Sequence, residues 1–255
     1  MRIQDSIALV TGGASGLGEA TVRNIVKHGG KAAILDLNEE RGKALVEELG
    51  ENAIFFKVNV TSEEDVQTAI DHTIAQFGGF NTVVNCAGIG HPEKTVSRNK
   101  AHDFNNFKRV VEINLFGTFN VIRLAAEKMV TNHPNSEGER GVIINTASVA
   151  AFDGQIGQAS YSASKGGVVG MTLPIARDLA KSGVRVVTIA PGLIETPLFG
   201  TLSDQAREAL EAQVPFPSRL GRPSEYAHLA QTIIENVLLN GETIRLDGAI
   251  RMAPR

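Results

Sequence analysis

The chain has 255 residues, of which 42% are hydrophobic and 21% are charged, as in an ordinary soluble globular protein. Its 25 Lys and Arg residues are scattered and balanced by 28 Asp and Glu residues, for a formal net charge of −3. This disfavours nucleic acid or an anionic membrane as the main partner, because both need a concentrated basic surface. Cys86 is the one cysteine, so no internal disulfide forms and a reducing compartment fits.

The 6 histidines show no spacing typical of metal ligands, and we predict no metal site. No apolar run is long enough to span a bilayer. The opening stretch leaves no room for a secretory signal before the first motif at Thr11. We therefore expect a cytoplasmic protein, with the mitochondrial matrix as the alternative.

Strand-like apolar segments alternate with helix-like segments along the chain, which indicates βα units and a parallel sheet. One helix is predicted to open with a capping box formed by Thr61 and Glu64. The predicted fold class is α/β: one Rossmann-type, doubly wound parallel sheet of about seven strands, with helices on both faces, in a single domain spanning 1–255. The strand-like segments are 6–12, 31–37, 53–60, 81–88, 141–148, 185–192 and 242–248.

Two stretches depart from this alternation. Residues 89–106 form a polar, basic insertion after the fourth predicted strand, and residues 193–222 form a long, proline-punctuated segment after the sixth. Ligands of open α/β sheets bind beyond the carboxyl ends of the strands. Both stretches follow strands, so we predict that they are substrate loops at that edge.

A glycine-rich loop joins the first predicted strand to the first helix. Gly12, Gly16 and Gly18 permit a tight turn and a close approach of backbone N–H groups to a pyrophosphate. A plain turn is the alternative, but a position between a buried strand and a helix favours a dinucleotide site.

Asp36 ends the second predicted strand, 18 residues after Gly18. A carboxylate there accepts hydrogen bonds from the adenosine ribose and repels a 2′-phosphate. We therefore predict NAD rather than NADP as cofactor; an Asp that only starts a turn is the alternative.

Tyr161 and Lys165 are separated by small residues in "YSASK". At that spacing they lie on the same face of a helix, and the small residues leave room for a ligand. Taken alone, such a pair is most simply explained as a surface contact. Other motifs are needed to support a catalytic role.

Those motifs occur in order along the chain: the glycine loop, "NCAG" (85–88), Asn114, "NTASVAAF" (145–152), "YSASK" (161–165) and "PG" (191–192). With this set the chain resembles the short-chain dehydrogenase/reductase family over nearly its full length. Within that family, segments such as "VPFPSRLG" and "NGETIRLDGAIRM" are similar to those of the branch that acts on 3-hydroxyacyl-CoA thioesters.

The resemblance implies four catalytic residues. Tyr161 would be the general acid/base, with the Lys165 ammonium lowering the pKa of the phenol from its usual ~10. Ser148 would orient the reacting oxygen. Asn114, in a helix that begins near Phe107, would hold a water that relays protons from Lys165.

The resemblance also implies cofactor and substrate contacts. In addition to the glycines, Asp36, Tyr161 and Lys165, the predicted NAD-binding residues are Ser15, Leu17, Asn59, Val60, Cys86, Ala87, Gly88, Pro191, Gly192, Ile194 and Thr196. Cys86 has no predicted redox role, and a helix cap before Pro197 is the alternative for Thr196. The predicted substrate contacts are Ser148, Tyr161, Gln155 and Gln158, with a helix-entry turn as the alternative for the two glutamines.

The expected activity is the reversible, NAD-dependent oxidation of an (S)-3-hydroxyacyl-CoA to the 3-ketoacyl-CoA. Lys94, Arg98 and Lys100 in the insertion would meet the phosphates of coenzyme A, with a solvated loop as the alternative. The first alternative activity is a dehydrogenase acting on hydroxysteroids or other secondary alcohols, and the second is a non-catalytic NAD-binding scaffold. Relatives are commonly homotetramers, and we expect the same here.

Overall fold

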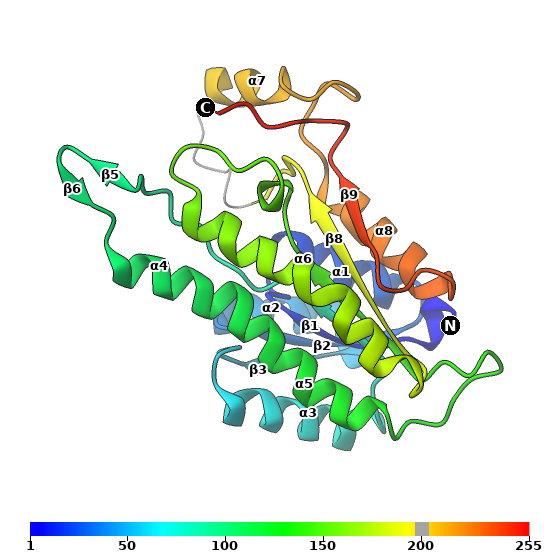
Figure 1. The fold of residues 1–255 in the computed structure, drawn as a ribbon. Coiled ribbons are helices and arrows are strands. Elements are labelled where there is room, and N and C mark those ends of the chain that lie inside the picture. Colours follow the sequence, from blue (N-terminus) through cyan, green and yellow to red (C-terminus); the bar gives the residue numbers. More distant parts are fainter. Residues whose placement is uncertain (197–203, 255) are drawn as a thin grey trace.

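The computed structural model describes residues 1–196 and 204–254, and a parallel β-sheet lies at its centre (Figure 1). Within these residues the sheet has seven strands in the order β3-β2-β1-β4-β7-β8-β9, and all neighbouring strands run parallel. Each predicted strand segment overlaps one of them, with β8 beginning one residue before the predicted segment, so the predicted fold class is confirmed. The strands are β1 (Ile7–Thr11), β2 (Lys31–Asp36), β3 (Ala53–Lys57), β4 (Thr82–Asn85), β7 (Gly141–Thr146), β8 (Val184–Pro191) and β9 (Thr243–Leu246).

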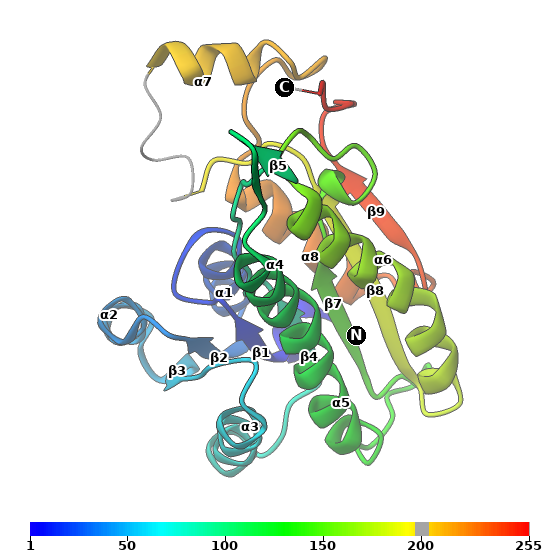
Figure 2. The same cartoon turned by 60° about the vertical axis from the view of Figure 1, so that its left-hand side comes forward.

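Helices cover both faces of the sheet (Figures 1 and 2). One face packs mainly against α3, α5 and α6, and the other against α1, α2 and α8. None of the helices in the described ranges has the length together with the hydropathy that a bilayer crossing requires. The helices are α1 (Gly16–Lys27), α2 (Glu39–Leu49), α3 (Glu63–Phe77), α4 (Phe104–Val111), α5 (Thr118–Met129), α6 (Ala159–Ala180), α7 (Asp204–Glu211) and α8 (Pro223–Glu235).

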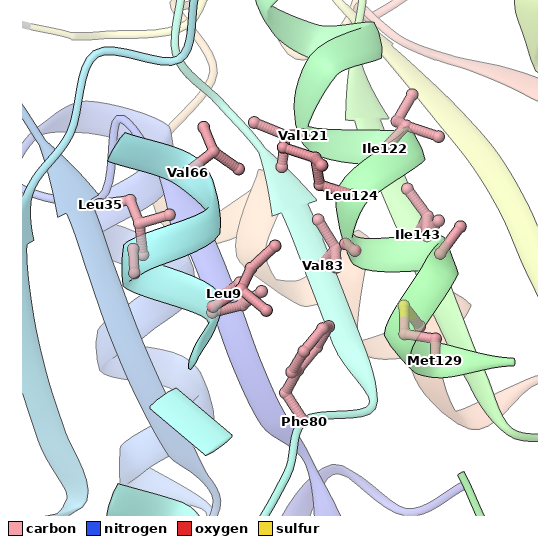
Figure 3. Packing of buried hydrophobic residues seen from close by; sticks show 14 of the residues in the cluster. Leu9, Leu35, Val66, Phe80, Val83, Val121, Ile122, Leu124, Met129 and Ile143 are labelled. Carbon is pink, nitrogen blue, oxygen red and sulfur yellow. The ribbon is translucent and has the colours of Figure 1, made fainter. Parts of the chain in front are cut away.

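Side-chain alternation along the strands produces the two cores. In β1, Leu9 packs against the α3 and α5 side, whereas Ala8 and Val10 pack against the α1 and α8 side. Figure 3 shows the first of these cores, where Leu9 and Val83 of the sheet face helical residues such as Val121. Because both faces are covered, strand residues are apolar at nearly every position.

The strand order reverses between β1 and β4, since the chain moves outward through β2 and β3 before returning beside β1. In an open α/β sheet, the carboxyl ends of the strands at such a reversal border the ligand crevice. The glycine loop after β1 and the "NCAG" segment after β4 lie at this point.

Helices α4 and α5 are joined by a π-helical turn, Glu112–Gly117, which contains Asn114. Such a turn holds one more residue than an α-helical turn and is frequent at functional sites. The helix begins at Phe104 rather than near Phe107, because the Asp103 side chain accepts a hydrogen bond from the Asn105 N–H (2.9 Å) and caps it. The predicted loop 89–106 therefore includes the first turn of α4.

The insertion also contains a short antiparallel hairpin, β5 (Val96–Ser97) and β6 (Lys100–Ala101). Its two turn residues, Arg98 and Asn99, have φ values of 49° and 61°. A hairpin turn with positive φ at both central positions usually contains glycine, so the sequence did not indicate it. In the second predicted loop, 193–222, residues 197–203 lie outside the described residues, and α7 occupies part of the remainder.

The predicted capping box of α3 is wrong by one residue. Ser62 is the N-cap and accepts the Asp65 N–H at 3.2 Å, while its hydroxyl donates to the Asp65 carboxylate at 2.8 Å. Thr61 instead donates its hydroxyl to Asn59 Oδ1 (2.9 Å), which closes the turn between β3 and α3.

Candidate active site

The glycine loop forms a tight cradle at the start of α1. Gly12 and Gly16 have φ values of 61° and 54°, a region that favours glycine. A Cβ at Gly18 would lie 2.2 Å from the carbonyl oxygen of Gly12, so only glycine fits. Of the other predicted pyrophosphate contacts, Ser15 is the N-cap residue of α1, and Leu17 is half-buried against the core.

Asp36 stands at the end of β2, beside the glycine loop. Its Oδ2 accepts the Ala14 N–H at 3.0 Å, and its Oδ1 accepts the Asn38 N–H at 2.9 Å. The second contact belongs to a local turn, which was the alternative role for Asp36. The first contact orients the carboxylate toward the glycine cradle. Each oxygen retains a lone pair for a ribose hydroxyl.

Asn59 and Val60, the two predicted cofactor residues after β3, differ in their exposure to solvent. Asn59 is exposed, and its amide oxygen already accepts two hydrogen bonds from Thr61, at 3.1 and 2.9 Å. Val60 is buried against Gly117, where a Cβ would lie 2.6 Å from Val60 Cγ2. The predicted contact of Asn59 with the cofactor therefore stays a prediction, and the Asn59 amide oxygen would have to share its two hydrogen bonds from Thr61 with the ligand.

The "NCAG" segment is fastened to the end of β1. Thr11 Oγ1 accepts the backbone N–H groups of Cys86 and Ala87, both at 3.2 Å. The Cys86 thiol donates to the Tyr226 hydroxyl oxygen and accepts from the Thr146 hydroxyl, both at 3.6 Å, and burial raises the pKa of this thiol. Sequence analysis missed Thr11, because its role depends on the pairing of strands that are distant in the chain.

Ser148, Tyr161 and Lys165 come together beyond the carboxyl end of β7. Ser148 follows that strand, and the other two residues lie on successive turns of α6. Lys165 is 4% exposed and donates from Nζ to the carbonyl oxygen of Thr146 at 2.8 Å. Its Nζ lies 5.8 Å from the centroid of the Tyr161 ring.

The expected lowering of the Tyr161 pKa by Lys165 is not found. Burial raises the pKa of Tyr161, and a hydrogen bond with Ser148 opposes this shift. Burial also lowers the pKa of Lys165, to about 8. The physical reason is that desolvation disfavours both charged forms, and the ammonium donates its hydrogen bond to the Thr146 carbonyl.

Asn114 connects the π-helical turn to α6. Its Nδ2 donates to the Ile89 carbonyl at 2.9 Å and to Ser164 Oγ at 3.1 Å. The Ser164 hydroxyl donates in turn to the carbonyl of Tyr161 at 2.7 Å. Ser164, which sequence analysis treated only as a small spacer, thus links Asn114 to the Tyr161 turn. The predicted water relay through Asn114 remains a prediction.

Gly88 completes this part of the site. A Cβ there would lie 3.2 Å from Asn114 Oδ1 and 3.4 Å from Lys165 Nζ. The absence of a side chain at Gly88 therefore keeps the approach to both groups open.

The predicted nicotinamide-side residues follow β8. Pro191 is its last residue, and a Cβ at Gly192 would lie 2.8 Å from Asp247 Cβ. Ile194 is buried and pairs with Gly221 in a parallel bridge. Thr196 is half-buried, and the residues after it that would decide its alternative role as a helix cap lie in the undescribed range 197–203.

Gln155 and Gln158 occupy the segment between Ser148 and Tyr161. Gln158 Oε1 accepts the backbone N–H of Gln155 at 2.9 Å, and Gln155 Nε2 donates to the carbonyl of Ala253 at 3.0 Å. These contacts correspond to the helix-entry turn that was the alternative. A substrate contact by either side chain stays a prediction.

The donor groups at this edge fit a nicotinamide dinucleotide. The cradle offers backbone N–H groups at a helix N-terminus, and the Asp36 carboxylate accepts hydrogen bonds. The Lys165 ammonium has three protons, and within the described residues it uses one of them, on Thr146. No three His, Cys, Asp or Glu side chains in the described ranges gather as metal ligands would.

A doubly wound sheet with a dinucleotide cradle and an adjoining Ser-Tyr-Lys set defines a nicotinamide-dependent oxidoreductase. The sequence profile of the short chain dehydrogenase family matches residues 6–207, and this chain belongs to that family.

The similarity extends over the whole chain. The 3-hydroxyacyl-CoA dehydrogenase type-2 of Bos taurus is 58% identical over 254 residues, which are 99% of this chain and 97% of that protein. The protein of the same name from Drosophila melanogaster is 56% identical, over 99% of this chain and 100% of that one. The crystal structure of 3-hydroxyacyl-CoA dehydrogenase type-2 from Mycobacterium avium superposes with a TM-score of 0.96 at 43% identity, covering 99% of this chain and 98% of that one.

Proposed function

We propose that this protein is an NAD-dependent dehydrogenase that interconverts (S)-3-hydroxyacyl-CoA and 3-ketoacyl-CoA thioesters. The observation that supports this reaction is that Ser148, Tyr161 and Lys165 lie close together at one edge of the sheet. The substrate class is supported by the full-length similarity to enzymes named for it.

Tyr161 accepts the proton of the reacting hydroxyl during oxidation and donates a proton to the carbonyl oxygen during reduction. Because burial raises its pKa, the phenol is protonated at neutral pH and stands ready to donate to the oxygen of a ketone. Oxidation needs the phenolate, so the oxidation rate should increase with pH while the reduction rate decreases. Ser148 hydrogen-bonds the same oxygen and holds it beside the phenol.

The nicotinamide, when bound, accepts or supplies the hydride. Lys165 would hold the adjacent ribose with the protons not used on Thr146, and Asn114 and Ser164 support the turn that carries Tyr161. The glycine cradle would bind the pyrophosphate. Asp36 would bind the adenosine ribose and disfavour NADP, since no 2′-phosphate can approach a carboxylate without repulsion.

The insertion would receive the coenzyme A portion of the substrate. Lys94, Arg98 and Lys100 are exposed on the hairpin region, and among the described residues none of the three has a carboxylate partner. Free cations at the edge of the site suit phosphate groups.

We also propose that 1–255 is one domain, because its sheet draws strands from β1 through β9, and that it assembles as a homotetramer. Phe116 and Phe119 are 61% and 47% exposed, and a groove of about 310 Å³ lies between α5 and α6. This exposed apolar surface supports the assembly, because a second copy of the chain would cover it. Sedimentation would measure the mass. The cytoplasmic location stays a prediction.

A substrate panel tests the proposed function. Acetoacetyl-CoA, steroid ketones and small ketones would be compared by the loss of NADH absorbance, with NADPH in parallel. We expect the highest kcat/KM with acetoacetyl-CoA and NADH. A higher value with a steroid ketone would favour the alternative activity, and no turnover with any ketone would favour a scaffold.

A further inference from the structure

The segment 152–158, which we call the substrate-side loop, connects the 3₁₀ turn after Ser148 to the start of α6. Three separate parts of the chain hold it. The Glu93 N–H from the insertion donates to the Gly157 carbonyl at 2.9 Å, and the Ile156 N–H donates to the Pro254 carbonyl of the C-terminal tail at 3.0 Å. The loop thus lies between the insertion and the tail.

The third contact is an ion pair between the loop and β9. Arg245 Nη2 donates to Asp153 Oδ2 at 2.6 Å, while Arg245 Nε donates to Asp247 Oδ2 at 2.7 Å. Nη2 also donates to the carbonyl of Ile250 at 2.9 Å. The guanidinium lies 5.3 Å from the centroid of the Phe152 ring. One side chain therefore joins the loop, the end of β9 and the tail.

The environment of Arg245 makes these contacts persistent. The exposed fractions of the Arg245, Asp153 and Asp247 side chains are 21%, 19% and 8%, so solvent competes weakly. The hydrogen bond from Arg245 is the main cause that lowers the pKa of Asp153. A planar guanidinium binds two carboxylates at fixed angles, which an ammonium cannot reproduce.

We propose that Arg245 is a positioning residue: by holding Asp153, it fixes the substrate-side loop and with it the wall of the pocket next to Ser148 and Tyr161. The inference rests on the proposed function, because it takes this pocket as the place where the carbonyl substrate binds. Within the described residues, the glycine cradle shares no hydrogen bond or ion pair with Arg245, Asp153 or Asp247. Gly192 on the nicotinamide side does pack against Asp247, but the Arg245–Asp153 ion pair can be removed with Asp247 left in place. Losing the ion pair should therefore affect substrate binding and leave dinucleotide binding unchanged.

The test compares Arg245→Met with Arg251→Met. Arg251 contacts Asp247 at 3.3 Å but is 64% exposed and donates no hydrogen bond to the described residues of the loop. Its charge also helps to lower the pKa of Asp153, so it is a control for the loss of a nearby positive charge without the loss of the ion pair. We expect Arg245→Met to raise the KM for acetoacetyl-CoA by about tenfold or more, since small misplacements near a reacting group are costly. The Kd of NADH, measured by fluorescence without turnover, should stay within twofold. Arg251→Met should change neither constant.

Asp153→Asn extends the test to the partner. It should raise the KM as Arg245→Met does, and the double variant should be no worse than either single variant, because both changes remove one interaction. Arg245→Lys should recover only part of the loss. If Arg245→Met does not fold, Asp153→Asn and Arg245→Lys still decide the matter.

Hydrogen exchange at the Ile156 amide supplies a readout without activity. Exchange should be faster in Arg245→Met than in Arg251→Met, since a released loop opens more often. A lowered melting temperature with unchanged KM and unchanged Ile156 exchange would reduce Arg245 to a stability role and overturn the inference. If acetoacetyl-CoA is not a substrate, the proposed function fails. The role of Arg245 can then still be tested by hydrogen exchange at the Ile156 amide and by the KM for whichever ketone the enzyme reduces.

Discussion

The glycine loop and the substrate-side loop flank the same Tyr161–Lys165 pair, but different contacts hold them. The glycine loop is fastened through its backbone, with the Gly12 N–H donating to the Leu35 carbonyl at 2.8 Å and Gly18 packed directly on Gly12. The substrate-side loop is held by the Arg245–Asp153 ion pair and by carbonyl groups of the tail.

This difference suggests how well the glycine loop and the substrate-side loop each tolerate substitutions. A loop packed backbone against backbone accepts no added side chain, so we expect its conformation to tolerate little change. A loop held by side chains and a tail can be altered by single substitutions without disturbing the sheet. Substrate preference is therefore expected to vary on the second side, and cofactor binding to stay constant on the first.

The largest effect on turnover is expected for Tyr161, which lies between the two loops. Tyr161→Phe removes the oxygen that exchanges the proton and should lower kcat by about 10³-fold or more. The aromatic ring remains, so the Kd of NADH should be unchanged. Stopped-flow turnover and fluorescence titration would measure both. Turnover above about a tenth of the wild-type rate would mean that another group transfers the proton.

The buried Lys165, which also lies between the two loops, should make the free energy of unfolding depend on pH. Its pKa is about 8 when folded and about 10.4 when unfolded. Below pH 8 both states carry the proton and the full penalty of the buried charge applies. As the pH rises toward 10.4 the folded state loses its proton first, so stability increases.

Wild type should therefore gain about 2 kcal/mol of unfolding free energy over Lys165→Met between pH 7.5 and 9.5, at 1.36 kcal/mol per pKa unit. Urea denaturation of both proteins without cofactor would measure this. Parallel curves for the two proteins would show that Lys165 is not desolvated.

On the cofactor side, Asp36→Asn retains an acceptor oxygen and removes the charge. The ratio of kcat/KM with NADP to that with NAD should increase by about tenfold or more, because repulsion of the 2′-phosphate disappears. Glu39→Gln is the control, since Lys43 already pairs with the Glu39 carboxylate at 2.8 Å. An equal increase in both variants would attribute the effect to overall charge.

The smallest expected effect is on the substrate side. Replacing Lys94, Arg98 and Lys100 with Ala should raise the KM for acetoacetyl-CoA by about fivefold and leave the KM for a small ketone unchanged, since exposed charges contribute little each. Lys27→Ala with Lys181→Ala removes exposed cations at the opposite edge of the sheet and serves as the control. Equal changes for both substrates would exclude docking of coenzyme A at the insertion.

The sheet was predictable because burial on both faces leaves an apolar signal in each strand. The cradle was predictable for a similar reason: Gly12, Gly16 and Gly18 are close in the chain and fulfil one local requirement. The same holds for Tyr161 and Lys165, which a single helix brings together.

The interactions that sequence analysis missed join residues far apart in the chain. Asn114 and Ser164 are on different helices, and Arg245 and Asp153 are separated by 92 positions. No local spacing relates such pairs. The pKa of Tyr161 was wrongly predicted for a related reason, because desolvation depends on everything packed around the phenol and not only on Lys165.

The π-helical turn at Glu112–Gly117 has a consequence for how this chain can diverge. It separates α4 from α5 by one residue more than a regular helix needs. Deleting that residue would leave a regular α-helical turn with α4 and α5 still in phase, so Val121 and Ile122 would stay in the core while the position of Asn114 opposite Ser164 would be lost. We expect such a deletion to leave the fold intact and to lower turnover.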